Sequence, residues 1–131
     1  MEYSFMVVDT CIFIEFLRKK NKNSATLMKI PKDRKLYISS VTLYELYMGA
    51  IDLDKKNDVE LLTSNISVLS LNKEVSIKAA EIFLQLKSSN QVVEFRDIFI
   101  AATAIVNELE LLTLNTKHFI NIPEIKLFNI S

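Results

Sequence analysis

Three acidic side chains stand where the sequence could bring them together to do chemistry. Asp9 ends a short apolar run, Glu45 lies within an apolar segment of helical period, and Asp97 begins another such segment. Carboxylates gathered within a few ångströms raise one another's pKa, so protons or a cation must neutralise them. A cluster with only oxygen ligands suits a hard divalent ion, Mg²⁺ or Mn²⁺. Convergence of these acids would therefore predict a metal site.

Each acid also has an ordinary structural explanation. Asp9 is equally well placed to be the N-cap of the helix that follows it. Glu45 follows Thr42 at the spacing of a capping box. Asp97 would lie in a first helical turn, where the helix dipole favours a carboxylate by about 0.3–1 kcal/mol. Only the meeting of all three acids in space would favour the functional interpretation.

The apolar pattern predicts strands that alternate with helices. Short apolar runs predict strands at 5–8, 36–38, 66–71, 110–113 and 127–128. Helical period predicts helices at 11–17, 25–29, 41–50, 73–87 and 94–106, with a polar connection running into a helix at 52–64 and a turn or short helix at 115–119. This alternation is typical of an α/β sandwich with a mainly parallel sheet.

The 73–87 helix is expected to serve only core packing. Its apolar residues, which we expect to face the core, are Val75, Ile77, Ala80, Phe83, Leu84 and Leu86.

The expected fold explains how distant acids could meet. In open parallel sheets, ligands bind beyond the carboxyl ends of the strands. Asp9 and Asn115 lie just past predicted strands, and Glu45 follows one by a short turn. Asp97 begins a helix, and right-handed crossovers place that helix end near the same edge. We therefore expect these four polar residues to converge.

Composition narrows the functional classes. A chain of 131 residues is most simply one domain, and its sixteen basic and sixteen acidic residues cancel. This balance argues against nucleic-acid binding by bulk charge, although basic residues cluster between positions 18 and 35. They form either a local basic patch or a solvated helix end and loop.

The counts of particular residue types, and the length of the apolar runs, exclude several further classes of protein. One Gly rules out the glycine-rich phosphate loops, and the lone Cys11 and lone His118 cannot form a zinc cage. Apolar runs fall short of the roughly 20 residues of a membrane span, and no signal-peptide pattern opens the chain. We expect a soluble, cytoplasmic protein that does not enter the membrane.

Four segments carry motifs whose order and spacing point to a known family. They are Val7-Val8-Asp9-Thr10, Ser39-x-x-Thr42-x-x-Glu45-Leu46 with Gly49, Asp97-x-x-Ile100-Ala101-Ala102-x-Ala104, and Leu112-Thr113-x-Asn115-x-x-His118-Phe119. Together they resemble the successive motifs of PIN domains, most closely the VapC-type toxins of bacterial and archaeal toxin–antitoxin pairs. The resemblance implies a single PIN domain over residues 1–131, built as a three-layer α/β/α sandwich with four or five short strands.

The resemblance also implies an activity and a metal-binding set. VapC-type toxins are metal-dependent endoribonucleases of type II toxin–antitoxin systems, which hydrolyse RNA phosphodiester bonds with metal-activated water. Asp9, Glu45 and Asp97 match the acids that hold Mg²⁺ or Mn²⁺, and Glu45, or a carboxylate next to it, would orient or deprotonate the water. Asn115 is included in the catalytic set, because it matches a polar residue that helps to fix the cluster.

Further positions follow from the same match. Thr10 and Thr113 match hydroxyl groups beside the metal. Many PIN domains carry a fourth acid where this chain has His118, so we expect one tightly bound ion. For His118 we expect a structural role that caps the turn, the alternative being contact with the scissile phosphate. Arg96 is expected to pair with a neighbouring acid and is assigned no catalytic part.

Partners are expected on three surfaces. Flanking RNA phosphates would contact the basic residues Arg18, Lys20, Lys22, Arg34 and Lys35. An antitoxin segment would contact the apolar first helix through Phe13, Phe16 and Leu17. A homodimer surface would use Tyr44, Tyr47 and Met48. The alternatives are a PIN nuclease of RNA maturation without an antitoxin, a non-catalytic RNA- or protein-binding module, and a DNA substrate.

Overall fold

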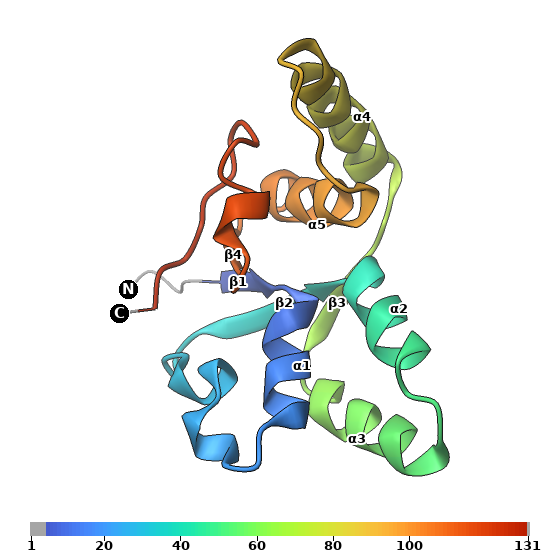
Figure 1. The fold of residues 1–131 in the computed structure, drawn as a ribbon, viewed down its shortest axis with the longest axis vertical. Coiled ribbons are helices and arrows are strands. Elements are labelled where there is room, and N and C mark those ends of the chain that lie inside the picture. Colours follow the sequence, from blue (N-terminus) through green and yellow to red (C-terminus); the bar gives the residue numbers. More distant parts are fainter. Residues whose placement is uncertain (1–4, 131) are drawn as a thin grey trace.

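The structure is a computed structural model that describes residues 5–130. Its strands and α-helices, in chain order, are β1 Phe5–Val8, α1 Thr10–Arg18, β2 Lys35–Ser39, α2 Ser40–Met48, α3 Leu53–Thr63, β3 Ser67–Leu69, α4 Lys73–Ser88, α5 Phe95–Val106 and β4 Glu110–Leu112 (Figure 1). Short 3-10 helices occur at Lys22–Ser24, Thr26–Lys29 and Thr116–His118. In the described part, no helix is long and apolar enough to cross a membrane.

One parallel sheet forms the centre of the molecule. Its four strands have the order β3-β2-β1-β4, and every pairing is parallel. Val7 of β1 pairs with Tyr37 of β2 on one side and with Leu111 of β4 on the other. The stretch expected as a fifth strand contributes a single parallel bridge, between Leu127 and Leu111.

Helices cover both faces of this sheet. Successive strand residues point to opposite faces, so Val7 joins the core cluster that α4 and α5 cover, whereas Met6 and Val8 join the cluster that α1, α2 and α3 cover. Figure 1 shows α4 and α5 on one side of the sheet and α1 and α3 on the other. The expected three-layer α/β/α sandwich with a parallel sheet is confirmed.

Helix α4 departs from the expected packing. Its buried residues are Val75, Ala79, Ile82 and Leu86, at alternating spacings of four and three. Of the residues expected in the core, Ala80 is exposed, and Ile77, Phe83 and Leu84 are 51%, 51% and 62% exposed. The expectation was wrong for these four because α4 packs chiefly on α5 and extends away from the sheet (Figure 1), which leaves it one narrow contact stripe.

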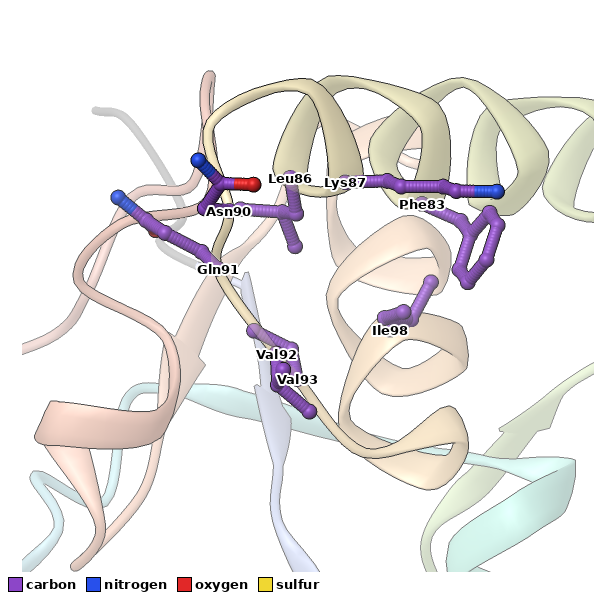
Figure 2. Close-up of a pocket in the computed structure, with 8 residues that line it drawn as sticks. All are labelled: Phe83, Leu86, Lys87, Asn90, Gln91, Val92, Val93 and Ile98. Atoms are coloured by element: carbon purple, nitrogen blue, oxygen red, sulfur yellow. The ribbon is translucent and has the colours of Figure 1, made fainter.

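The connection from α4 to α5 separates two clefts. Figure 2 shows the first, a cleft of about 400 Å³ with Phe83 and Leu86 of α4, Ile98 of α5 and Val92 and Val93 of the connection on its walls. The second, of about 480 Å³, lies where the same connection meets Asp97 and His118. The connection therefore borders the acid at the start of α5.

Glu15 supplies a pH-dependent contribution to stability. Its Oε1 accepts a hydrogen bond from the backbone N–H of Thr26 (2.7 Å), which lowers the pKa of Glu15 below its ordinary value. The lowered folded-state pKa stabilises the protein above the ordinary pKa of about 4.3, and this contribution disappears as the pH falls through the folded value.

We expect Glu15→Gln to cost about 0.5–1 kcal/mol at pH 7, because the amide can keep the hydrogen bond but loses the charge. Urea unfolding of both proteins at pH 7 and pH 3 checks this. The difference should vanish at pH 3, and an equal difference at both values would contradict the role of the charge.

Candidate acidic site

Asp9, Glu45 and Asp97 come from three separate elements at the carboxyl edge of the sheet. Asp9 follows β1, Glu45 lies in α2, and Asp97 lies in the first turn of α5. Asp9 and Asp97 are 0% and 1% exposed, whereas the Glu45 side chain keeps 20% of its surface. Asp9 and Asp97 therefore lie buried at the base of the site, and Glu45 lies partly exposed at its rim, the edge that faces solvent.

Asp9 is the N-cap of α1 and also lies in the acidic cluster. As the N-cap of α1 its Oδ1 accepts from the backbone N–H of Thr10 (2.8 Å). Its Oδ2 accepts from the hydroxyl of Thr113 (2.7 Å) and from the thiol of Cys11 (3.5 Å). These bonds come from the start of α1 and from the residue after β4, and together they fix the carboxylate in one orientation. Burial, with the charge of Asp9 adding to it, raises the pKa of the Cys11 thiol.

Glu45 points into the cluster and does not cap its own helix. Ser39 is the N-cap of α2, and its hydroxyl accepts from the backbone N–H of Thr42 (3.1 Å). The Thr42–Glu45 capping box is therefore wrong. Instead, Glu45 Oε1 accepts from the hydroxyl of Thr10 (2.6 Å), and the oxygen of that hydroxyl lies 3.0 Å from the buried hydroxyl of Thr42.

Arg96 joins all three acids. Its Nη2 donates to Asp9 Oδ1 (2.9 Å) and Glu45 Oε1 (2.9 Å), its Nε donates to Glu45 Oε2 (2.7 Å), and its Nη1 donates to Asp97 Oδ1. Burial disfavours the charged guanidinium, but the hydrogen bonds to Glu45 and the charge of Asp9 raise the pKa of Arg96 above its ordinary value. Pairing of Arg96 with a neighbouring acid was expected; its contacts with Asp9 and Glu45 were not.

The environment of Asp97 disfavours a negative charge. Burial raises its pKa, and the charge of Asp9 adds to this, whereas Arg96 and His118 oppose it. His118 Nδ1 lies 3.3 Å from Asp97 Oδ2, so the exposed imidazole borders the acid from the loop after β4. The site gathers more negative charge than the one guanidinium can balance.

The donor set fits a divalent ion. Oxygens of three carboxylates already surround a single positive group, and the Thr10 and Thr113 hydroxyls orient two of those carboxylates. Hard ions of the Mg²⁺ class prefer such ligands. Within residues 5–130, no group of acids, His and Cys is arranged around a metal-sized centre, and the guanidinium lies between the carboxylates.

Asn115 reaches the site only indirectly. Its side chain is exposed, and its backbone N–H donates to the Thr113 hydroxyl (3.0 Å), which in turn holds Asp9. In the described residues no hydrogen bond links the Asn115 side chain to the acids.

The basic residues expected to bind RNA are dispersed. Arg18 shares a groove of about 360 Å³ with Glu45, and Lys20 is exposed beyond α1. Lys22 donates to the carbonyls of Phe16 and Leu17 at the end of α1. Arg34 lies over the ring of Phe128 and Lys35 over that of Tyr37, at the amino end of β2 and away from the acids.

The surfaces expected to bind proteins need one correction. Phe13 is 0% exposed and belongs to the core beneath the sheet, so the expectation that it contacts an antitoxin is wrong. The reason is that α1 is covered on two sides, by the sheet and by the 3-10 turn Thr26–Lys29. Phe16 and Leu17 are half-buried. Tyr44, Tyr47 and Met48 are 66%, 39% and 61% exposed, as a dimer surface requires.

A parallel α/β/α sandwich that brings acids from three distant segments to the carboxyl edge of its sheet defines a class of domains with an acidic site at that edge. The family model for the PIN domain matches residues 6–125. The chain therefore belongs to the PIN domain family, as its motifs predicted.

Individual similar proteins indicate which type of PIN domain this chain resembles. A protein named ribonuclease VapC from Rickettsia bellii is 30% identical, over 95% of this chain and 96% of its own length. One named ribonuclease VapC1 from Methanocaldococcus jannaschii is 26% identical, over 94% and 85%. Among solved structures, the DNA-bound VapBC from Salmonella typhimurium has a TM-score of 0.85 and 27% identity, covering 99% of this chain and 100% of that one. The resemblance to VapC-type toxins is confirmed.

Proposed function

We propose that this chain is a metal-dependent endoribonuclease and the toxin of a type II toxin–antitoxin pair, acting in the cytoplasm as one PIN domain over residues 1–131. The observation that carries the proposal is the convergence of Asp9, Glu45 and Asp97 on one cation position. The relatives named ribonuclease VapC support RNA as the substrate.

The three acids would hold one Mg²⁺ or Mn²⁺ ion. When bound, such an ion polarises a phosphoryl oxygen and lowers the pKa of a bound water. His118 stands where a fourth acid would add ligands for a second ion, and we retain the expectation of a single tight site.

Asp9 and Glu45 would have distinct tasks that follow from their contacts. Asp9 is held from both oxygens, by the Thr10 backbone and the Thr113 hydroxyl, and acts as a fixed ligand. Glu45 is the partly exposed acid at the rim, so it is placed to orient the attacking water or accept its proton. The Thr10 hydroxyl holds Glu45 Oε1 in place for this task.

The proposed partners are RNA, an antitoxin and a second copy of the chain. The solved relative from Salmonella typhimurium is a VapBC structure bound to DNA. In this chain, Leu17 lines the groove that leads to Glu45, which suits an antitoxin segment that covers the site. Phe16 lies beside Leu17 on α1, and Tyr44, Tyr47 and Met48 of α2 are the proposed dimer surface.

The test is cleavage of a labelled single-stranded RNA by the purified chain, with a DNA strand of the same sequence as the comparison. We expect RNA cleavage with Mn²⁺ or Mg²⁺, none with EDTA, and recovery when the ion is restored. Cleavage that persists in EDTA would contradict the metal-dependent mechanism. Cleavage of DNA alone would contradict the assignment of RNA.

A further inference from the structure

The guanidinium of Arg96 occupies the position that the three carboxylates share. It contacts Asp9, Glu45 and Asp97 at the same time, through Nη2, Nε and Nη1. Arginine carries five N–H donors in a rigid plane that matches carboxylates in pairs. One side chain from the first turn of α5 therefore connects acids that lie 87 and 51 residues away along the chain.

The oxygens that bind Arg96 are those that a divalent ion needs. Asp9 Oδ2 is engaged by the Thr113 hydroxyl, so Oδ1 faces the cation position, and Oδ1 accepts from Arg96. Mg²⁺ binds oxygens at about 2.0–2.1 Å in a nearly octahedral arrangement. A guanidinium that stays charged, bonded to the same oxygens, would repel the ion and block its ligands.

Arg96 can vacate this position without unfolding. Its side chain keeps 24% of its surface exposed. The cleft of about 480 Å³ lined by Gln91, Val93 and His118 opens beside Asp97. Rotation of this one long side chain out of the site would need no movement of α5.

We propose that Arg96 is the built-in counter-cation of the metal-free site and that a divalent ion must displace it, so that Arg96 lowers the metal affinity of the resting protein. The inference rests on the proposed metal-dependent function. The concentration of free Mg²⁺ or Mn²⁺ would then determine the fraction of the protein that carries a metal ion, while the metal-free protein stays folded.

The test measures metal binding directly, by calorimetric titration of Mn²⁺ into the metal-free full chain. We expect Arg96→Gln to bind Mn²⁺ at least about tenfold more tightly than the wild type, because the competing charge is gone. Arg96→Lys should lie between the two, since it keeps the charge but loses the planar contacts. Lys87→Gln, which removes one positive charge from the last turn of α4, should stay within about twofold of the wild type.

Thermal unfolding gives a second readout. Metal-free Arg96→Gln should melt at least about 5 °C below the wild type, because three acids then face one another without their counter-charge. Saturating Mn²⁺ should close this gap. If Arg96→Gln does not fold, Arg96→Lys carries the test, with an expected affinity at least about threefold above the wild type.

The outcomes separate this inference from the proposed function. Equal or weaker Mn²⁺ affinity in a folded Arg96→Gln would show that Arg96 does not compete, and would overturn the inference while leaving the metal site intact. Absence of Mn²⁺ binding in both the wild type and Arg96→Gln would remove the proposed metal-dependent function, and this inference with it.

Discussion

Asp9→Asn is expected to lower the rate of RNA cleavage at saturating Mn²⁺ by about 100- to 1,000-fold, equivalent to about 3–4 kcal/mol of transition-state stabilisation. Asp9 is fully buried, and its Oδ1 faces the cation position. The Asn side chain is neutral, so it weakens the hold on the ion. With its oxygen kept on the Thr10 N–H, its amide would also present N–H donors to the Thr113 hydroxyl, which donates to Asp9 in the native protein.

This substitution separates the two roles of Asp9. Asn is as good an N-cap as Asp, so α1 keeps the bond that begins the helix while the site loses its charge. Initial cleavage rates and circular dichroism melting of the same samples check the prediction. If a folded Asp9→Asn variant cleaved RNA at the wild-type rate, Asp9 would serve only as the N-cap of α1.

Asp52→Asn is the matched control. Asp52 is likewise the N-cap of its helix, α3, although it accepts from the backbone N–H three residues on, that of Lys55 (2.8 Å), and it is exposed and outside the acidic cluster. We expect its cleavage rate to stay within about twofold of the wild type. Loss of activity in both variants would trace the effect to helix capping and not to the metal site.

The sheet and the acids could be predicted from the sequence because both depend on local patterns. Strands buried on both faces appear as short apolar runs, and β1 begins and ends where the run at 5–8 predicted. Acids that follow such runs must lie at the carboxyl edge of a parallel sheet. Asp9 and Glu45 therefore lie in one cluster. The hydrogen bond from Thr10, the residue after Asp9, to Glu45 joins positions that are 35 residues apart in the chain.

Two features could not be predicted because they depend on which neighbours pack where. The helical period of α4 identifies its apolar residues, but it does not show that only the narrow stripe through Val75 and Ile82 meets α5. The position of Arg96 next to Asp97 indicates one ion pair, but its reach to Asp9 and Glu45 depends on the assembled sheet. A basic residue directly before a predicted metal-binding acid was the available signal.

Phe13 shows the same limit for helix α1. The residues of α1 are apolar around most of its circumference, which suggested a surface for a partner. In the fold, the sheet and the turn at Thr26–Lys29 cover much of that circumference, and Phe13 becomes one of the largest fully buried side chains. Phe16, half-buried with Lys22 over its ring, remains a proposed contact together with Leu17.

We therefore expect Phe13→Ala to lower the free energy of unfolding by about 3–5 kcal/mol, through lost burial and the cavity left among Met6, Ile12 and Ile38. Against a total stability of about 5–15 kcal/mol, this loss is large. Urea unfolding measures it, and an unchanged m-value would show that the unfolded state is the same.

Phe83→Ala provides the control for the loss of an aromatic ring as such. Phe83 is 51% exposed on α4, so its truncation should cost about 1 kcal/mol or less. If Phe13→Ala also binds the antitoxin more weakly, we attribute this to the lower stability of the variant. Antitoxin binding should then recover at temperatures well below the melting point of the variant. A loss of about 1 kcal/mol or less for Phe13→Ala, with antitoxin binding abolished at all temperatures, would instead place Phe13 on the partner surface and contradict its position in the core.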